Sequence, residues 1–212
     1  MKLKKIICLF LASVMLLALV SCKNAENTTV DTNKQDSESA ADSGENPKIA
    51  ITVKDYGTMT FELYPDIAPI TVENFLKYVD DGFYNGLTFH RIYSGFMIQG
   101  GDPKGDGTGN GKFGNIKGEF SANGVSNTIS HKRGVISMAR GQANDSASCQ
   151  FFICHADSKF LDGNYAAFGK ITEGLDVLDA IASAKVTANI YSGEVSTPVN
   201  PPVIESIVRV AD

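Results

Sequence analysis

The amino-acid sequence predicts a mainly β domain, a closed antiparallel barrel of eight strands capped by two α-helices. Eight short segments carry strand signals, only two carry a helical period, and the turns between them are rich in glycine. A βαβ sheet needs a helix between successive strands, so this order of elements favours a barrel. The 212 residues are 43% hydrophobic, which is ample for one packed core.

The first two strands form a predicted hairpin, and a helix follows them. In residues 49–53 and 59–63 apolar side chains alternate with small or polar ones, the period of a half-buried strand, and a turn at residues 55–57 separates them. Thr71 is then expected to cap a helix that Gly82 ends. The apolar positions of this helix recur at helical spacing: Val72, Phe75, Leu76 and Val79.

Six further strand candidates and one further helix complete the domain. The strand candidates are Leu87–Ile92, Phe96–Gln99, Val135–Ala139, Gln150–Cys154, Ala167–Ile171 and Ile204–Val210. The second helix is expected over Leu175–Ala182. If Cys149 and Cys154 share one strand they lie about 16 Å apart on opposite faces. They are therefore not expected to form a disulfide.

The N-terminus has the pattern of an export signal. Three lysines precede an apolar run of about 15 residues, short of the ~20 that span a membrane as a helix. The run ends in Leu19-Val20-Ser21-Cys22, which resembles the bacterial lipobox. That resemblance implies a signal peptide over 1–21 and a lipid on Cys22. A plain secretory signal and an uncleaved anchor are the alternatives.

Residues 22–46 are interpreted as the lipidated cysteine and a disordered tether. The segment is polar, has no aromatic residue and cannot bury enough surface to offset its chain entropy. Residues 47–212 then form the working domain. The expected location is the bacterial cell envelope, outside the cytoplasm and anchored to a membrane.

Several functional classes are excluded by composition and spacing. A net charge of −5 argues against a nucleic-acid partner. The three histidines, His90, His131 and His155, lie far apart in sequence, so a metal site built from them is not expected. Residues 109–114 spell G-x-G-x-x-G, but no strand feeds them and no helix follows, so they are interpreted as a surface loop.

Three segments carry the functional signal. They are Phe89–Asp102, then Gly134–Arg140 with Gln150–Ile153 ten residues later, and finally Phe160–Gly163 leading to Phe168–Lys170. In this order and near this spacing they resemble the cyclophilin family of peptidyl-prolyl cis-trans isomerases, over roughly residues 47–212. The resemblance implies an enzyme that isomerises X–Pro bonds in polypeptides, here assisting the folding of exported proteins. The alternative is a catalytically weak proline-peptide-binding module or chaperone on the same barrel. A monomer is expected.

Isomerisation needs a slot for the pyrrolidine ring and a cation near the twisting peptide. No bond is broken, so no nucleophile, metal or cofactor is required. The resemblance implies that Arg91 is catalytic and that Gln99 positions both Arg91 and the peptide. The remaining residues it assigns bind the substrate: Phe96, Met97, Phe152 and Leu161 in the proline slot, Ala139, Arg140 and Gln150 along the peptide backbone, and Phe160 and Tyr165 at the rim. Phe160 stands where the family often has Trp, so weak binding of cyclosporin-type macrocycles is expected.

Overall fold

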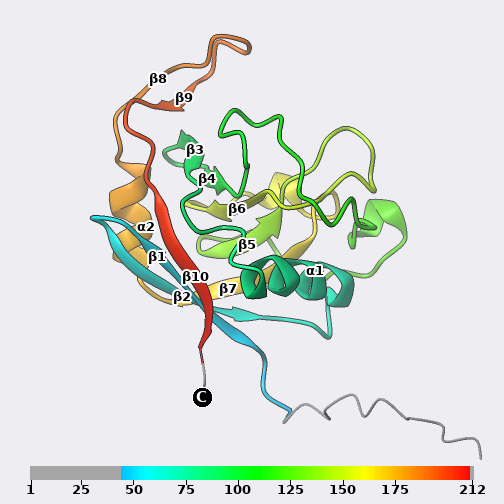
Figure 1. Cartoon of the computed structure of the whole chain (residues 1–212). Helices are drawn as coiled ribbons and strands as arrows, with labels where there is room; N and C mark the ends of the chain where they lie inside the picture. Colours follow the sequence, from blue (N-terminus) through cyan, green and yellow to red (C-terminus); the bar gives the residue numbers. More distant parts are fainter. Residues whose placement is uncertain (1–43, 211–212) are drawn as a thin grey trace, which may run out of the picture. The chain divides into compact units, whose positions relative to one another are not determined.

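Eight of the ten strands that the structure describes pair into one curled antiparallel sheet (Figure 1). This computed structural model describes residues 44–210, so the predicted signal peptide, Cys22 and most of the tether lie outside the described residues. The sheet contains β1 (Lys48–Val53), β2 (Gly57–Leu63), β3 (Phe89–Tyr93), β4 (Met97–Gly100), β5 (Val135–Met138), β6 (Phe151–Cys154), β7 (Ala167–Glu173) and β10 (Ile204–Val210). Their order is β10-β1-β2-β7-β5-β6-β4-β3. All eight overlap the predicted strands.

The two edge strands of the sheet, β10 and β3, meet near their first residues. An isolated antiparallel bridge joins Thr88 to Val203. Beside it, Gly86 N donates to Ile204 O and Ile204 N donates to Leu87 O, both at 2.8 Å. No continuous ladder between β3 and β10 is found among the described residues. The mainly β fold is confirmed, while complete closure of the barrel stays a prediction.

Two helices accompany the sheet, α1 (Pro69–Asp80) and α2 (Leu175–Ala182), as predicted. The predicted cap of α1 is wrong, because Ala68 holds the N-cap position and Thr71 lies inside the first turn. Proline at the first helical position needs no hydrogen-bond acceptor. The buried Glu119 carboxylate accepts the free donors instead: Ile70 N at 3.1 Å, Thr71 N at 2.8 Å and Thr71 Oγ1 at 2.6 Å.

A small hairpin forms a second sheet that the sequence did not predict. Its strands are β8 (Val186–Ala188) and β9 (Val195–Pro198). Two short 3-10 turns, η1 (Ser121–Asn123) and η2 (Lys159–Leu161), complete the secondary structure. The β8–β9 hairpin projects from the end of the sheet where β3 and β4 lie (Figure 1), and β9 packs against β3.

The main core contains a cluster of buried aromatic rings on α1 and the sheet. Phe75 of α1 contacts Tyr84, Phe151 and Phe168 at centroid distances of 5.2, 5.5 and 5.1 Å. Along β6, Phe151 and Ile153 enter this core, while Phe152 and Cys154 point to a smaller cluster on the other face. Successive side chains of a strand point to opposite faces, which accounts for this alternation.

Both cysteines of the domain are free and buried. Burial raises the pKa of the Cys149 thiol to about 11 and that of Cys154 to about 12. Within residues 44–210 no three His, Cys, Asp or Glu side chains are grouped as they would be to hold a metal ion. No helix in this range has the length and apolar character needed to cross a membrane.

Candidate functional site

One pocket gathers nine of the residues predicted for the site. It has a volume of about 130 Å³, and we call it the β4–β6 pocket after the two strands that form its floor. It is lined by Arg91, Phe96, Met97, Gln99, Ala139, Arg140, Phe152, Leu161 and Tyr165. These side chains come from β3, β4, β6, η2 and the segments that follow β5 and η2, so the fold brings together residues far apart in sequence.

The floor of the β4–β6 pocket is apolar and buried. Met97 of β4 and Phe152 of β6 are at most 5% exposed, and Leu161 of η2 packs with them. Strand pairing sets their positions, because Gln99 pairs with Phe152 and alternate residues of β4 and β6 face the same side. Tyr165 closes one wall, its ring edge-on to that of Phe152 at 5.7 Å. The result is a slot for a small apolar ring.

Arg91 supplies the charge at the pocket mouth. It pairs with Gln99 in the β3–β4 register, and Arg91 Nη1 donates to Gln99 Oε1 at 3.3 Å. Gln99 Nε2 in turn donates to Gln150 Oε1 at 3.0 Å, and Gln150 Nε2 donates to Gly109 O at 2.8 Å. This chain of amides orients the Gln99 oxygen toward the guanidinium.

A carboxylate that the sequence did not point to holds the other edge of Arg91. Arg91 Nε donates to Glu194 Oε2 at 2.7 Å, and Nη2 donates to Glu194 Oε1 at 2.8 Å. The hydrogen bonds from Arg91 lower the pKa of the Glu194 carboxyl to about 2. Glu194 lies in the turn of the β8–β9 hairpin, which has no strong strand signal, so no local pattern singled it out.

Two predicted site residues lie outside the lining of the β4–β6 pocket. Phe160 is 72% exposed, and its ring packs on that of Phe96 at 5.4 Å, at the rim. Gln150 lines a neighbouring cavity of about 320 Å³ that also contains Gln99, Ala139 and Arg140. Both therefore border the pocket without lining it.

Arg140 is engaged within the protein as well as lining the pocket. Its Nε donates to Asn164 O at 2.9 Å, and its guanidinium lies 4.9 Å from the centre of the Tyr165 ring. The side chain thus packs on the Tyr165 wall of the pocket.

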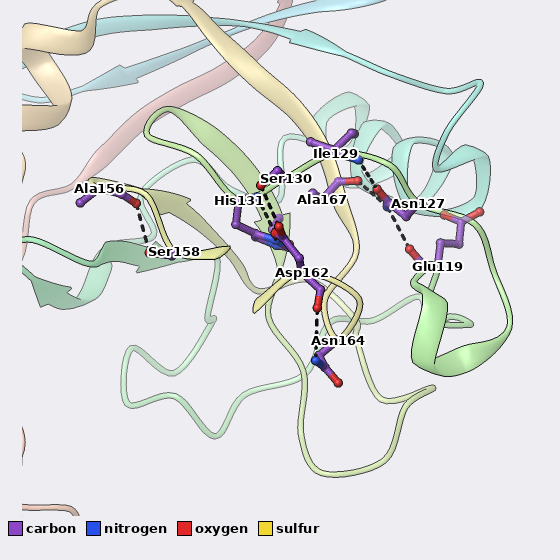
Figure 2. Close-up of polar contacts among 11 residues, drawn as sticks. Glu119, Asn127, Ile129, Ser130, His131, Ala156, Ser158, Asp162, Asn164 and Ala167 are labelled. Atoms are coloured by element: carbon purple, nitrogen blue, oxygen red, sulfur yellow. Dashed lines mark hydrogen bonds and ion pairs between the residues drawn. The ribbon is translucent and has the colours of Figure 1, made fainter. Parts of the chain in front are cut away.

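A partly buried polar network lies beside the pocket floor, and Figure 2 shows its contacts around His131 and Asp162. Asp162, next to Leu161, accepts from Ser130 Oγ and from His131 N, both at 2.7 Å, and pairs with His131 Nδ1 at 2.8 Å. His131 Nε2 lies 3.0 Å from Ser137 Oγ. The His131 ring stacks on Phe152 with centroids 5.9 Å apart. The sequence had excluded His131 from a metal site and had not found this role.

The network contains the Ser, His and Asp of a serine-hydrolase triad, but its serine hydroxyl is not accessible to a substrate. Ser137 is 0% exposed and His131 is 1% exposed, so no substrate reaches the hydroxyl. Burial lowers the pKa of His131, which keeps the imidazole neutral at neutral pH. We therefore interpret these three residues as a brace for the β4–β6 pocket.

Comparison with known proteins gives one consistent result. The model of the family described as "Cyclophilin type peptidyl-prolyl cis-trans isomerase/CLD" matches residues 48–209. A peptidyl-prolyl cis-trans isomerase of Helicobacter pylori is 45% identical over 136 residues, which are 63% of this chain and 80% of that protein. Peptidyl-prolyl cis-trans isomerase B of Bacillus subtilis is 41% identical over 138 residues, which are 65% of this chain and 92% of that protein.

Solved structures agree with the sequence comparisons. A cyclophilin type peptidyl-prolyl cis-trans isomerase of Cryptosporidium parvum superimposes with a TM-score of 0.70 at 28% identity, covering 79% of this chain and 99% of that one. The same protein was also solved in the presence of the dipeptide Ala-Pro, with a TM-score of 0.69 to this chain.

Proposed function

Because the chain belongs to the cyclophilin-type peptidyl-prolyl cis-trans isomerase family, and so is an enzyme that isomerises X–Pro bonds, we propose that Arg91 and the β4–β6 pocket carry the reaction. The observation that carries the proposal is the placement of one guanidinium edge at the mouth of a buried apolar slot. The expected substrates are proline-containing polypeptides.

The chemistry follows from the peptide bond. Rotation about X–Pro crosses a barrier of about 18–20 kcal/mol because C–N resonance is lost in the twisted state. In that state the prolyl nitrogen becomes a better acceptor, and a guanidinium hydrogen bond to it or to the carbonyl stabilises the transition state selectively. A charged hydrogen bond contributes about 1.5–3 kcal/mol.

The pocket supplies the rest by binding the twisted peptide better than the planar one. An acceleration of about 10⁴ corresponds to roughly 5.5 kcal/mol, more than one hydrogen bond provides. We assign the pyrrolidine ring to the slot formed by Phe96, Met97, Phe152 and Leu161. With the ring held, the carbonyl side of the bond is free to rotate past Arg91.

The remaining site residues bind the peptide on either side of proline. Gln99 orients Arg91, and the segment at Ala139 and Arg140, with Gln150, offers backbone and side-chain groups along the pocket edge. Phe160 and Tyr165 form the rim. Isomerisation only rotates the X–Pro bond and breaks no covalent bond, so the reaction needs neither a metal nor a cofactor.

The surroundings of the enzyme are part of the proposal. The lipobox-like Leu19–Cys22 supports a lipid anchor on Cys22, and the polar composition of residues 23–46 supports a tether between that anchor and the domain. We place a monomeric domain with a closed barrel at the bacterial cell envelope, where it assists the folding of exported proteins. Labelling of the intact protein with a radioactive fatty acid, lost in Cys22→Ala, tests the anchor.

The central experiment measures isomerisation of a short X–Pro peptide by the intact protein and by Arg91→Ala. The variant is expected to lose about 100-fold in kcat/KM, roughly 2.7 kcal/mol, while staying folded. Arg209→Ala is the matched control, because Arg209 makes the same two-point contact with Asp80 far from the pocket. Full activity of a folded Arg91→Ala protein contradicts the assignment. A folded wild type that binds the peptide without accelerating it favours the binding-module alternative.

A further inference from the structure

We propose that Glu194 is a positioning residue for the isomerisation, since its carboxylate holds the Arg91 guanidinium with one edge turned toward the β4–β6 pocket. The inference rests on the role proposed above for Arg91. The two residues are 103 positions apart in the sequence, and the β8–β9 hairpin brings Glu194 to the site.

The contact between Glu194 and Arg91 fixes an orientation as well as a distance. Both carboxylate oxygens accept, at 2.7 Å from Nε and 2.8 Å from Nη2. A two-point contact of this kind defines the plane of the guanidinium, whereas a single hydrogen bond leaves it free to rotate. The Arg91 side chain is 34% exposed, so without this contact it has room to turn toward water.

The two edges of the guanidinium have different surroundings. Nε and Nη2 face Glu194, while Nη1 lies 3.3 Å from Gln99 Oε1 and 4.0 Å from Met97 Sδ. Arg91, Met97 and Gln99 all line the β4–β6 pocket, and Glu194 does not. The carboxylate therefore holds Arg91 from the side away from the substrate and leaves the Nη1 edge for the peptide.

The hairpin turn that carries Glu194 is itself closed by hydrogen bonds. Asn189 N donates to Glu194 O at 2.7 Å, and Gly193 N donates to Asn189 O at 2.8 Å. The Asn189 side-chain oxygen accepts from Tyr191 N and Ser192 N at 2.9 and 3.1 Å. These bonds hold the backbone of Glu194, and the packing of β9 on β3 places it beside Arg91.

A carboxylate beside a catalytic cation has two opposed effects on the rate. It reduces the field of the cation at the peptide, and it reduces the reorganisation needed to align the donor. Since Glu194 occupies the far edge and Arg91 keeps its charge, the orienting effect is expected to dominate. Loss of Glu194 should then lower activity, whereas a purely damping carboxylate would raise activity when removed.

Substitution of Glu194 distinguishes the orienting effect of its carboxylate from the damping effect. Glu194→Ala is expected to lower kcat/KM about tenfold, mainly through kcat, which corresponds to about 1.4 kcal/mol. Glu194→Gln keeps one acceptor oxygen without the charge and should lie between the two proteins. Glu205→Gln, which removes an exposed carboxylate from β10, is the control and should retain wild-type activity.

A double variant tests whether the effect passes through Arg91. Arg91→Ala/Glu194→Ala is expected to equal Arg91→Ala alone, because a positioning residue has nothing left to position. The Arg91 Nε–H signal in ¹⁵N NMR spectra, protected from exchange in the wild type, should lose its protection in Glu194→Ala. Circular dichroism checks that each variant is folded.

The outcomes distinguish this inference from the proposed function. If Arg91→Ala is inactive and folded Glu194→Ala keeps or exceeds wild-type activity, the inference fails and the role of Arg91 stands. A further loss on adding Glu194→Ala to Arg91→Ala also overturns it. If Arg91→Ala is fully active, both proposals fail together.

Discussion

The two sides of the β4–β6 pocket are held in place by different interactions. The floor, with Met97 and Phe152, belongs to the sheet and is braced by the pair of buried His131 and half-buried Asp162. The charged side depends on one half-exposed ion pair between Arg91 and a small separate hairpin. The floor therefore shares the stability of the fold, whereas the orientation of Arg91 is a local matter that the fold does not require.

The sharpest way to break this comparison is to measure unfolding after one substitution on each side. Phe152→Ala removes a buried ring and should cost about 3–5 kcal/mol in unfolding free energy, from lost burial and the cavity left behind. Arg91→Ala removes a half-exposed ion pair and should cost about 1 kcal/mol or less. Urea denaturation of both proteins gives the two values. Equal losses would show that the charged side is as structural as the floor.

A smaller effect is expected from the brace beneath the floor. Asp162→Asn keeps the size of the side chain but loses a charged acceptor for Ser130 and for both His131 groups. The unfolding free energy should fall by about 1.5–3 kcal/mol, and the pocket should bind peptide less tightly because Leu161 is adjacent. Asp157→Asn, in the same region but exposed, is the control for loss of the charge. An Asp162→Asn protein with unchanged stability but altered activity would show that this network shapes the pocket without stabilising the fold.

The pH dependence of the two sides should also differ. Burial lowers the pKa of His131, so the unfolded chain binds a proton more readily, and stability should fall as the pH drops below about 6.5. The Glu194 carboxyl, with its pKa lowered to about 2, should stay ionised and paired with Arg91 in the folded protein until the pH approaches about 2. Its contribution to stability should begin to fall below about 4.5, where the unfolded chain takes up the proton. NMR titration of the His131 ring and the Arg91 Nε–H signal follows both events in one sample. His131 protonation near pH 6.5 would contradict the first expectation.

The smallest effect is expected at the rim, where neither side is disturbed. Phe160→Trp adds an indole N–H to an exposed side chain, so stability should change by less than about 0.5 kcal/mol. Affinity for a cyclosporin-type macrocycle should rise a few-fold, about 0.5–1.5 kcal/mol for one hydrogen bond. Isothermal titration calorimetry measures this, and Phe160→Leu serves as the variant without a donor. No gain over the wild type would remove Phe160 as the cause of weak binding.

The sequence predicted the features that depend on local patterns and missed those that depend on contacts between distant residues. Strand signals are local, and they placed all eight strands of the main sheet, the first two through the alternation of apolar and polar side chains. The order of three motifs placed the pocket residues. The cap of α1 was wrong because Glu119 follows Thr71 by 48 residues, and a helix start carries no sign of a distant carboxylate.

The missed residues have the same cause. Val186–Ala188 and Val195–Pro198 are only three and four residues long, and the buried positions of the second strand are Ser196 and Pro198, so the hairpin has no hydrophobic period to reveal it. The contact of Glu194 with Arg91 is revealed only by the structure, in which the hairpin packs against β3. The His131 network was hidden because its three residues are separated in sequence and joined only by the packing of β5 and η2.

The β8–β9 hairpin forms its own small sheet, apart from the eight-stranded sheet of the enzyme. Its two strands pair only with each other, so insertions or deletions in residues 186–198 leave the eight-stranded ladder intact. Substitutions in the hairpin can therefore change the surroundings of Arg91 without breaking a hydrogen-bonded ladder of the eight-stranded sheet. A hairpin outside the eight-stranded sheet thus lies directly beside the residue assigned to the chemistry.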